Sequence, residues 1–392
     1  MKETNIDFDK KVDRKNTDCL KFDFAVERGK PADVLPLWVA DMDFKTSSLV
    51  VDEIKKRVEH GIFGYTETGE EYFNTVSSWF SKHHNLKIEK EWIVKTPGVV
   101  FALAMAVKAY TKEGDSILIQ QPVYYPLSEV INDNKRVVVS NDLVLGEDNK
   151  YHIDFEDFER KVVSNNIKLF ILCSPHNPIG RVWKKEELEQ LAKIAIKHDL
   201  IVVSDEIHAD FTYEGYKHIP LLNIDERLKS RVITCTSPGK TFNLAGLQIS
   251  NIFIPDNDLR DKFKKQVAAA GYSQVNTMGI VACEASYKYG VEWYQELKKY
   301  LQANLEFVKD YLKNELPQIK LIEPEGTYLV WLDFSGLKYN DNELEDLIVN
   351  KAKLWLDSGA IFGKSGSGFQ RINIATNRSI IKEALDRIKK VI

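Results

Sequence analysis

Three polar segments that could do chemistry each lie at the end of a short apolar run that predicts a buried strand. They are C-S-P-H-N-P (173–178), S-D-E-I-H (204–208) and T-S-P-G-K-T-F-N (236–243). Each alone is weak evidence, because an asparagine beside prolines is usually a turn former and a lysine is usually a solvated surface residue. If the three strands end at one edge of a sheet, an amide, a carboxylate and an amine converge there. Such a set could hold an aromatic heterocycle.

The elements that must position these groups follow an α/β pattern from about residue 98 to 255. The predicted strands are 5–7 residues long and apolar on both faces: 116–121, 167–173, 200–205, 231–236 and 250–254. Between two of them, residues 184–198 place Leu188, Leu191 and Ala195 on one helical face. Alternating strands and helices predict an α/β fold with a mostly parallel central sheet, whose ligands bind at the carboxyl ends of its strands.

The pattern changes after about residue 258. Helical patterns at 258–289 and 291–315 precede a strand-like T-Y-L-V-W-L-D at 327–333, and a terminal helix carries Ile381, Leu385, Ile388 and Ile392. We expect a large α/β domain at 49–290 and a smaller α+β domain, made of 1–48 and 291–392, that closes over the substrate site. The glycine-rich stretch 363–368 lacks the order of a dinucleotide-binding motif and predicts a mobile loop.

Composition narrows the function classes. The 392 residues include 54 Lys+Arg and 58 Asp+Glu, a formal charge of −4, which disfavours partners such as nucleic acid or an anionic membrane. With 44% hydrophobic and 29% charged residues, the chain is not globally disordered. The four cysteines are too far apart for a disulfide framework or a common zinc cluster, so we expect no metal. The acidic start predicts no signal peptide, and the longest apolar run is far below the ~20 residues of a membrane span, which predicts a cytoplasmic protein.

A fourth residue completes an ordered set that resembles a known family. Asn177, Asp205, Lys240 and Arg371 follow one another at gaps of 28, 35 and 131 residues. This order resembles the fold-type I pyridoxal-phosphate enzymes of the class I/II aminotransferase superfamily, and in particular the MalY/PatB-type cystathionine β-lyases. The matching motifs run from L-P-L-W-V-A-D-M-D-F (35–44) to F-Q-R-I-N-I-A (369–375), nearly the whole chain. The resemblance implies a large domain with a mostly parallel sheet flanked by helices, and a smaller domain.

The resemblance also implies roles for the residues around the cofactor ring. Lys240 would hold pyridoxal 5'-phosphate covalently and then move the substrate α-proton, which requires an amine that is partly neutral. Asp205 would keep the pyridine nitrogen protonated. Asn177 would donate to the phenolate oxygen, and Tyr124 would stack on the ring, with Tyr125 as its competitor.

The cofactor phosphate and the substrate need further groups. By resemblance, Ser237 and the start of a helix that runs to about residue 110 would bind the phosphate, the helix through Gly98, Val99 and Val100. Tyr65 would reach the phosphate and substrate from the other subunit, which implies a homodimer with shared sites. Arg371 would grip the substrate carboxylate bidentately, as a lysine cannot. Asn177, Trp38 and Ala40 would also lie near the substrate.

Three departures from typical aminotransferases bear on the reaction. His208 stands among the cofactor-binding residues where aminotransferases commonly have tyrosine, and Gln248 replaces a phosphate-binding arginine. The MalY/PatB group is similar at both positions, which favours a lyase. Gly239 replaces the serine that usually precedes the lysine, and this removes a possible hydrogen bond to the phosphate.

Three functions therefore stay open. The favoured one is β-elimination from L-cystathionine or related S-substituted cysteines, which releases a thiol such as homocysteine with pyruvate and ammonia, in methionine biosynthesis. The second is an aminotransferase acting on an amino acid and a 2-oxo acid. The third is a partner-binding protein on a degenerate fold of the same kind.

Overall fold

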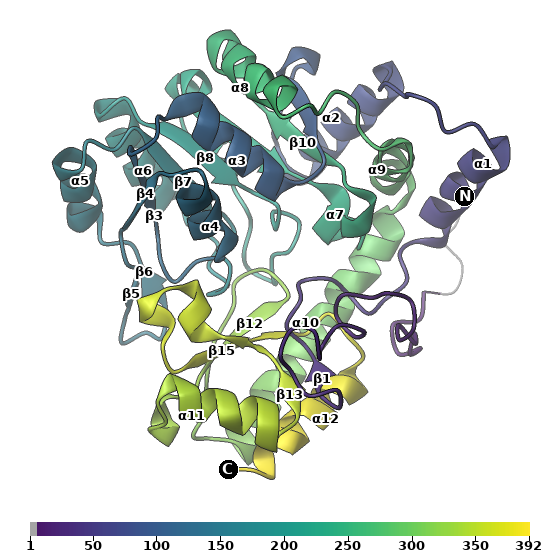
Figure 1. The fold of residues 1–392 in the computed structure, drawn as a ribbon, viewed down its shortest axis with the longest axis vertical. Coiled ribbons are helices and arrows are strands. Elements are labelled where there is room, and N and C mark those ends of the chain that lie inside the picture. The colour runs from purple at the N-terminus through teal and green to yellow at the C-terminus, as the bar shows by residue number, and fades with distance from the viewer. Residues whose placement is uncertain (1–5) are drawn as a thin grey trace.

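A seven-stranded sheet and its flanking helices form the upper part of the molecule in Figure 1, a computed structural model that describes residues 6–392. In sheet order the strands are β2 (Ile93–Thr96), β10 (Ser250–Phe253), β9 (Val232–Thr236), β8 (Ile201–Asp205), β7 (Leu169–Cys173), β3 (Ser116–Ile119) and β4 (Val137–Ser140). The pairs from β9 to β4 are parallel, whereas β10 is antiparallel to both β9 and β2. The predicted α/β fold with a mostly parallel sheet is confirmed.

Helices cover this sheet because their apolar faces pack on strands that are buried on both sides. Every residue of β7 and β9 is buried. The helices of this part are α1 (Ser48–His60), α2 (Glu70–His84), α3 (Val99–Tyr110), α4 (Pro126–Asp133), α5 (Phe155–Ser164), α6 (Lys185–Lys197), α7 (Pro238–Thr241), α8 (Asn257–Ala269) and α9 (Thr277–Tyr289). In α6 the predicted face of Leu188, Leu191 and Ala195 is buried.

A second, four-stranded antiparallel sheet forms the lower part of Figure 1, in the order β11 (Lys320–Ile322), β12 (Leu329–Asp333), β15 (Phe369–Asn373) and β14 (Asp357–Ser358). The long helix α10 (Val291–Glu315) contacts α9 of the upper part. It also contacts β11 and α12 (Arg378–Lys389) of the lower part. Smaller elements are α11 (Asp341–Glu345) and two-stranded pairs of β1 (Leu35–Pro36) with β13 (Leu354–Trp355) and β5 (Val144–Leu145) with β6 (Tyr151–His152).

The structure differs from the expected elements in three places. The pattern at 258–289 is two helices rather than one, because the chain turns at Gly271 (φ +73°) and α9 starts afresh with Asn276 as its N-cap. Strands β2 and β4 were not predicted; both are four residues long and only partly buried, so their apolar pattern is weak. The stretch 363–368 contains a short 3₁₀ turn at Lys364–Gly366, and its mobility stays a prediction.

Within residues 6–392 no helix is both long and apolar enough to cross a membrane. The proposed division at residues 48 and 290 also stays a prediction, and its first five residues lie outside the described residues.

Candidate active site

A cavity of about 200 Å³ lies where β7, β8 and the loop after β9 end. Its wall includes ten of the thirteen residues that the sequence predicted for the site: Ala40, Gly98, Val99, Val100, Tyr124, Asn177, Asp205, His208, Ser237 and Lys240. The three strands are parallel neighbours, so their carboxyl ends share one edge of the sheet. The convergence expected from the three polar segments is therefore present.

Lys240 enters the cavity from α7, a single helical turn. Ser237 caps that turn by accepting a hydrogen bond from the Gly239 N–H at 3.0 Å. The Lys240 amine donates to the carbonyl oxygen of Ala40 at 2.6 Å. Burial lowers the pKa of Lys240 to about 8, helped by the charge of Arg371 and opposed by those of Asp41 and Asp205. The lysine is thus partly neutral near neutral pH, as a nucleophile or base requires.

Asp205 ends β8 and is buried, and its carboxylate accepts one hydrogen bond, from the Ile207 N–H at 3.2 Å. No ion pair to Asp205 occurs in the described part of the chain. Burial raises the pKa of Asp205 to about 7, and the nearby charge of Glu206 adds to this effect. A cationic ring nitrogen bound in the cavity would stabilise the ionised form of this carboxylate, because it would supply the charged partner that Asp205 lacks.

Asn177 and Tyr124 also line the cavity and are held together, because the Tyr124 N–H donates to the Asn177 carbonyl oxygen at 2.9 Å. Tyr124 lines the cavity and Tyr125 does not; the ring of Tyr125 instead makes an edge contact with Phe362. Tyr124 rather than Tyr125 is therefore placed to meet a ligand in the cavity, and its stacking on the cofactor ring stays a prediction.

His208 contributes a neutral imidazole to the wall. Burial lowers its pKa to about 3, and the positive charges of Lys240 and Arg371 act in the same direction. Its ring meets Tyr328 edge-on with 5.9 Å between centroids. The Nδ1 atom has no hydrogen-bond partner among residues 6–392. His208 can therefore make one hydrogen bond to a ligand through Nδ1, but the side chain is uncharged.

The start of α3 forms one end of the cavity. Gly98 is its N-cap in an extended conformation, with no side chain capping the first N–H groups, which belong to Val99, Val100 and Phe101. Such an end attracts an anion through free N–H groups and the helix dipole. The Ser237 hydroxyl lies on the same wall and donates to the Ile249 carbonyl oxygen at 2.7 Å. A Cβ at Gly239 would lie 3.0 Å from that hydroxyl, which explains why glycine suits this position.

Arg371 approaches the cavity from β15 of the other sheet but is not part of its wall. It donates to the Asn177 side-chain oxygen at 2.9 Å and to the Trp38 carbonyl oxygen at 2.8 Å. It also forms a buried ion pair with Asp357 on β14, and its guanidinium lies over the Phe362 ring. The Nε atom has no partner among the described residues. The Nε–H and one Nη1–H are thus the donors that remain for a carboxylate.

The other two predicted residues outside the wall are Trp38 and Tyr65. The Trp38 indole stacks on Trp355 with centroids 4.4 Å apart, so only its backbone carbonyl serves Arg371. Tyr65 is 93% exposed and does not line the cavity. Neither side chain reaches the cavity from within its own subunit.

The sequence did not indicate several residues that the site uses. Cys173, Ile207 and Ser250 line the cavity, Tyr328 donates to the Ala40 carbonyl oxygen at 2.9 Å, and Asp357 pairs with Arg371. Cys173, Ser250 and Tyr328 lie at ends of predicted strands, which was the available signal. For Asp357 there was none, because its pairing with Arg371 depends on β14 lying beside β15.

The unpartnered groups define the ligand that would fit. Asp205 lacks a cationic partner, the buried Ser250 hydroxyl lacks a hydrogen bond among residues 6–392, and the start of α3 lacks a cap. Together they suit a planar ring with a basic nitrogen at one end and a phosphate at the other. The buried, partly neutral Lys240 amine suits an aldehyde between them.

Comparisons with known proteins cover nearly the whole chain. The model of the family described as aminotransferase class I and II matches residues 32–388. Cystathionine beta-lyase PatB of Bacillus subtilis (strain 168) is 40% identical over 384 residues, which cover 98% of this chain and 99% of PatB. The structure of cystalysin from Treponema denticola, which contains pyridoxal 5'-phosphate, is 40% identical with a TM-score of 0.95 and covers 98% of each chain. A PLP-bound putative aminotransferase from Clostridium difficile 630 is 41% identical, with a TM-score of 0.96 over 99% of this chain and 100% of that one.

Proposed function

Because this chain belongs to the aminotransferase class I and II family, we propose that it is a pyridoxal-phosphate-dependent carbon–sulfur β-lyase. It cleaves L-cystathionine or related S-substituted cysteines to a thiol, pyruvate and ammonia. The observation that carries this conclusion is the single cavity in which Lys240, Asp205 and Asn177 converge, with Arg371 beside it.

Pyridoxal phosphate supplies an electron sink for the negative charge that develops at the substrate α-carbon. Lys240 would hold its aldehyde carbon and Asp205 its ring nitrogen, while Asn177 would donate to its ring oxygen, Tyr124 would stack on its ring and His208 would be a further contact. The first N–H groups of α3 and the hydroxyls of Ser237 and Ser250 would hold the phosphate. The unpartnered Ser250 hydroxyl and the uncapped start of α3 agree with the phosphate assignment, whereas the Ser237 hydroxyl already donates to the Ile249 carbonyl oxygen.

The chain's own residues then account for the elimination. Arg371 would bind the α-carboxylate through the N–H donors that Asn177, Trp38 and Asp357 leave free. Lys240, whose buried amine is partly neutral, would remove the α-proton. The electron pair of the Cα–H bond forms the Cα–Cβ double bond as the Cβ–S bond breaks, and the sulfur leaves as thiolate. Water then releases pyruvate and ammonia.

The charges at the site favour elimination from a zwitterionic substrate over transamination of a dicarboxylate. Among the described residues of the cavity wall, Lys240 is the only cation and no arginine is present, so Arg371 beside the wall is the arginine available to a substrate carboxylate. Gln248, where aminotransferases commonly carry an arginine, is exposed and lies outside the wall. The aminotransferase reaction remains the second candidate.

A homodimer with shared sites is part of the proposal. Large apolar side chains are exposed along the end of α1 and the loop that follows: Val58, Ile62, Phe63 and Tyr65. Val100, at the phosphate end of the cavity, is exposed too. A second copy covering this patch would bury these side chains, and its Tyr65 would reach the phosphate. Residues 49–290 would form the large domain and residues 1–48 and 291–392 the small one, in a cytoplasmic enzyme of methionine biosynthesis.

A product assay tests the reaction. The purified holoenzyme is given L-cystathionine with and without a 2-oxo acid acceptor, and thiol and pyruvate are measured. The lyase releases both without acceptor, whereas product formation that strictly requires the acceptor makes the enzyme an aminotransferase. Lys240→Ala should abolish turnover and the visible absorbance of bound cofactor; retention of both would show that the site is assigned wrongly.

A further inference from the structure

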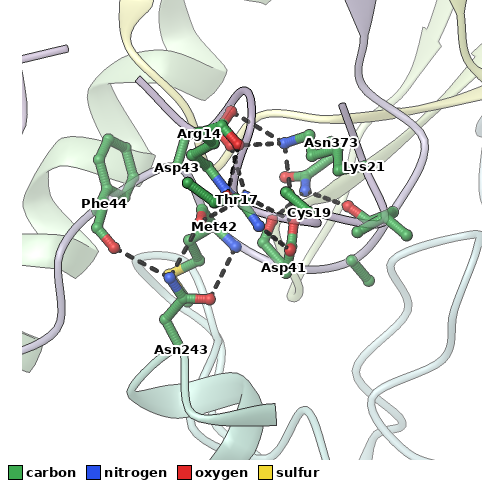
Figure 2. Close-up of polar contacts among 12 residues, drawn as sticks. Arg14, Thr17, Cys19, Lys21, Asp41, Met42, Asp43, Phe44, Asn243 and Asn373 are labelled. Atoms are coloured by element: carbon green, nitrogen blue, oxygen red, sulfur yellow. Dashed lines mark hydrogen bonds and ion pairs between the residues drawn. The ribbon is translucent and has the colours of Figure 1, made fainter. Parts of the chain in front are cut away.

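Residues 37–44, which we name the crossing segment, run between the two sheets and pass beside Lys240. From the four-stranded sheet, the Asn373 amide donates to the carbonyl oxygens of Val39 and Asp41, each at 2.6 Å. From the loop after α7, the Asn243 amide donates to the carbonyl oxygens of Met42 and Phe44 at 3.0 and 2.9 Å (Figure 2). The crossing segment is therefore anchored through its peptide groups to the four-stranded sheet on one side and to the loop after α7 on the other.

Ala40 is the point at which the crossing segment meets the catalytic lysine. Its carbonyl oxygen accepts hydrogen bonds from the Lys240 amine at 2.6 Å and from the Tyr328 hydroxyl at 2.9 Å. Ala40 lies between the carbonyl oxygens of Val39 and Asp41, which Asn373 holds. A shift of the crossing segment would therefore move the acceptor that orients the lysine.

Two cations from the N-terminal region bind the acidic side chains of the crossing segment (Figure 2). Arg14 spans both carboxylates, with contacts of 2.5 Å to Asp41 and 2.8 Å to Asp43. Lys21 is fully buried and donates to both oxygens of Asp43 at 3.0 and 2.9 Å, and it lies 3.8 Å from Asp41. A fully buried lysine is rare and costly unless it is paired in this way.

The N-terminal region presents these cations without regular secondary structure. Residues 6–30 contain only turns and bends. The Asp23 carboxylate shapes the loop between the two cations, because it accepts hydrogen bonds from the N–H groups of Asn16, Thr17 and Cys19 at 2.9–3.1 Å. The pKa of Asp23 is lowered by these backbone hydrogen bonds, so the loop keeps this arrangement at neutral pH.

We propose that Arg14 and Lys21 are positioning residues of the active site: by binding the carboxylates of Asp41 and Asp43 they fix the Ala40 carbonyl beside Lys240 and counter the acidic charge that faces it. The inference rests on the proposed role of Lys240. Arg14, Lys21, Asp41 and Asp43 would then support the site from behind Ala40, which is 200 residues from Lys240 in the sequence.

The charges around Lys240 predict that Arg14 affects the protonation of the lysine nitrogen. The groups that face the lysine are Asp41 from the crossing segment, Asp205 from β8, Arg371 from β15, the neutral His208, and the hydroxyls of Tyr124 and Tyr328. Burial lowers the pKa of Lys240, and the Asp41 charge acts against this. Arg14 offsets the Asp41 charge. Its removal should therefore favour the protonated form of the lysine nitrogen.

The test titrates the visible absorbance of the cofactor bound to Lys240 in the holoenzyme. Arg14→Gln should raise the pH midpoint by about half a unit and Asp41→Asn should lower it by a similar amount, with the double variant between them. Arg227→Gln is the matched control, because Arg227 forms an exposed ion pair with Asp225 and should leave the midpoint unchanged. In the cofactor-free chain, Arg14→Gln should speed amide hydrogen exchange within residues 37–44.

A purely structural role predicts a different result. Arg14→Gln would then lower the thermal unfolding midpoint while the pH midpoint stays at the wild-type value, and this overturns the proposal. Shifts of Arg14→Gln and Asp41→Asn in the same direction overturn it as well. If Arg14→Gln does not fold, Asp41→Asn alone decides, since it must lower the midpoint. Absence of cofactor absorbance in the wild-type protein would instead contradict the proposed function.

Discussion

At the scale of single residues, the buried charged groups of the site have few hydrogen-bond and ion-pair partners, which leaves them able to bind ligand groups. Arg371 shares its fork among Asn177, Trp38 and Asp357, and the side chain of Asp205 meets only one N–H donor. Burial raises the pKa of Asp357 although Arg371 opposes this, so the pair is held in a poorly solvated place. A substrate carboxylate would give Arg371 a further partner, and a cofactor nitrogen would give Asp205 the cationic partner that it lacks.

The planar fork of Arg371 should matter more than its charge. We expect Arg371→Lys to lower kcat/KM for L-cystathionine by about 10- to 100-fold, mainly through KM, because lysine keeps the charge but cannot make two parallel hydrogen bonds. Steady-state kinetics measure the effect. An unchanged KM would mean that Arg371 does not bind the carboxylate.

Asp205 should make the stability of the cofactor-free chain pH-dependent. Its folded pKa of about 7 lies above the ordinary aspartate value of 3.8, so between these values the folded chain binds one more proton than the unfolded chain and loses stability as the pH rises. Asp205→Asn removes this loss, which is on the order of a few kcal/mol. Urea unfolding of the cofactor-free proteins should show the variant to be the more stable at pH 8, with the difference shrinking toward pH 4. Greater stability of the wild type at pH 8 would contradict this assignment.

At the scale of elements, short irregular pieces position the chemistry while the long helices and strands provide the frame. Lys240 lies on a single helical turn, and Thr241, the next residue, donates to the buried carboxylate of Asp210 at 2.5 Å. The turn after β7 is tied to the loop before β12, since the Gly180 carbonyl oxygen accepts from the N–H groups of Glu325 and Gly326 at 2.8 and 2.9 Å. The Gly180 contacts join the two sheets near the cavity, whereas the Thr241 contact holds the turn that carries Lys240.

Gly180 offers a test of this connection. It has a φ of +70°, and an added Cβ would lie 2.5 Å from Pro324 Cβ. We expect Gly180→Ala to lower the free energy of unfolding by about 2–4 kcal/mol, through backbone strain and the clash. Gly215→Ala is the matched control: its φ is +85° but no atom lies within 4 Å of the added Cβ, so it should cost only about 1 kcal/mol. Equal losses for the two variants in urea unfolding would exclude the clash.

At the scale of the whole molecule, the site needs both sheets and, in our proposal, a second subunit. Arg371 comes from the four-stranded sheet, and Tyr65 has no role within its own subunit's cavity. The exposed apolar patch around Tyr65 is the surface on which a second copy would lie.

Subunit mixing tests the shared site. Tyr65→Ala and Lys240→Ala should each be nearly inactive, because one lacks the contact across the interface and the other lacks the catalytic lysine. In a mixed dimer, the subunit with intact Lys240 receives Tyr65 from its partner. An equal mixture that is unfolded and refolded together should regain about a quarter of wild-type activity, because half of the dimers are mixed and one of their two sites is complete. No recovery would argue against a site shared through Tyr65.

The sequence by itself determined the strand ends that carry Asn177, Asp205 and Lys240, because parallel strands place their carboxyl ends at one edge and each apolar run is short and clear. Resemblance to a family then added Arg371 and the cofactor. The tertiary structure alone decided which groups support them: Asp357 beside Arg371, and Arg14 and Lys21 behind Asp41 and Asp43. These pairs join residues from turns, edge strands and a segment without regular structure, where no periodic pattern exists. Their partners are chosen by which charges folding buries together, and that information is not local in the chain.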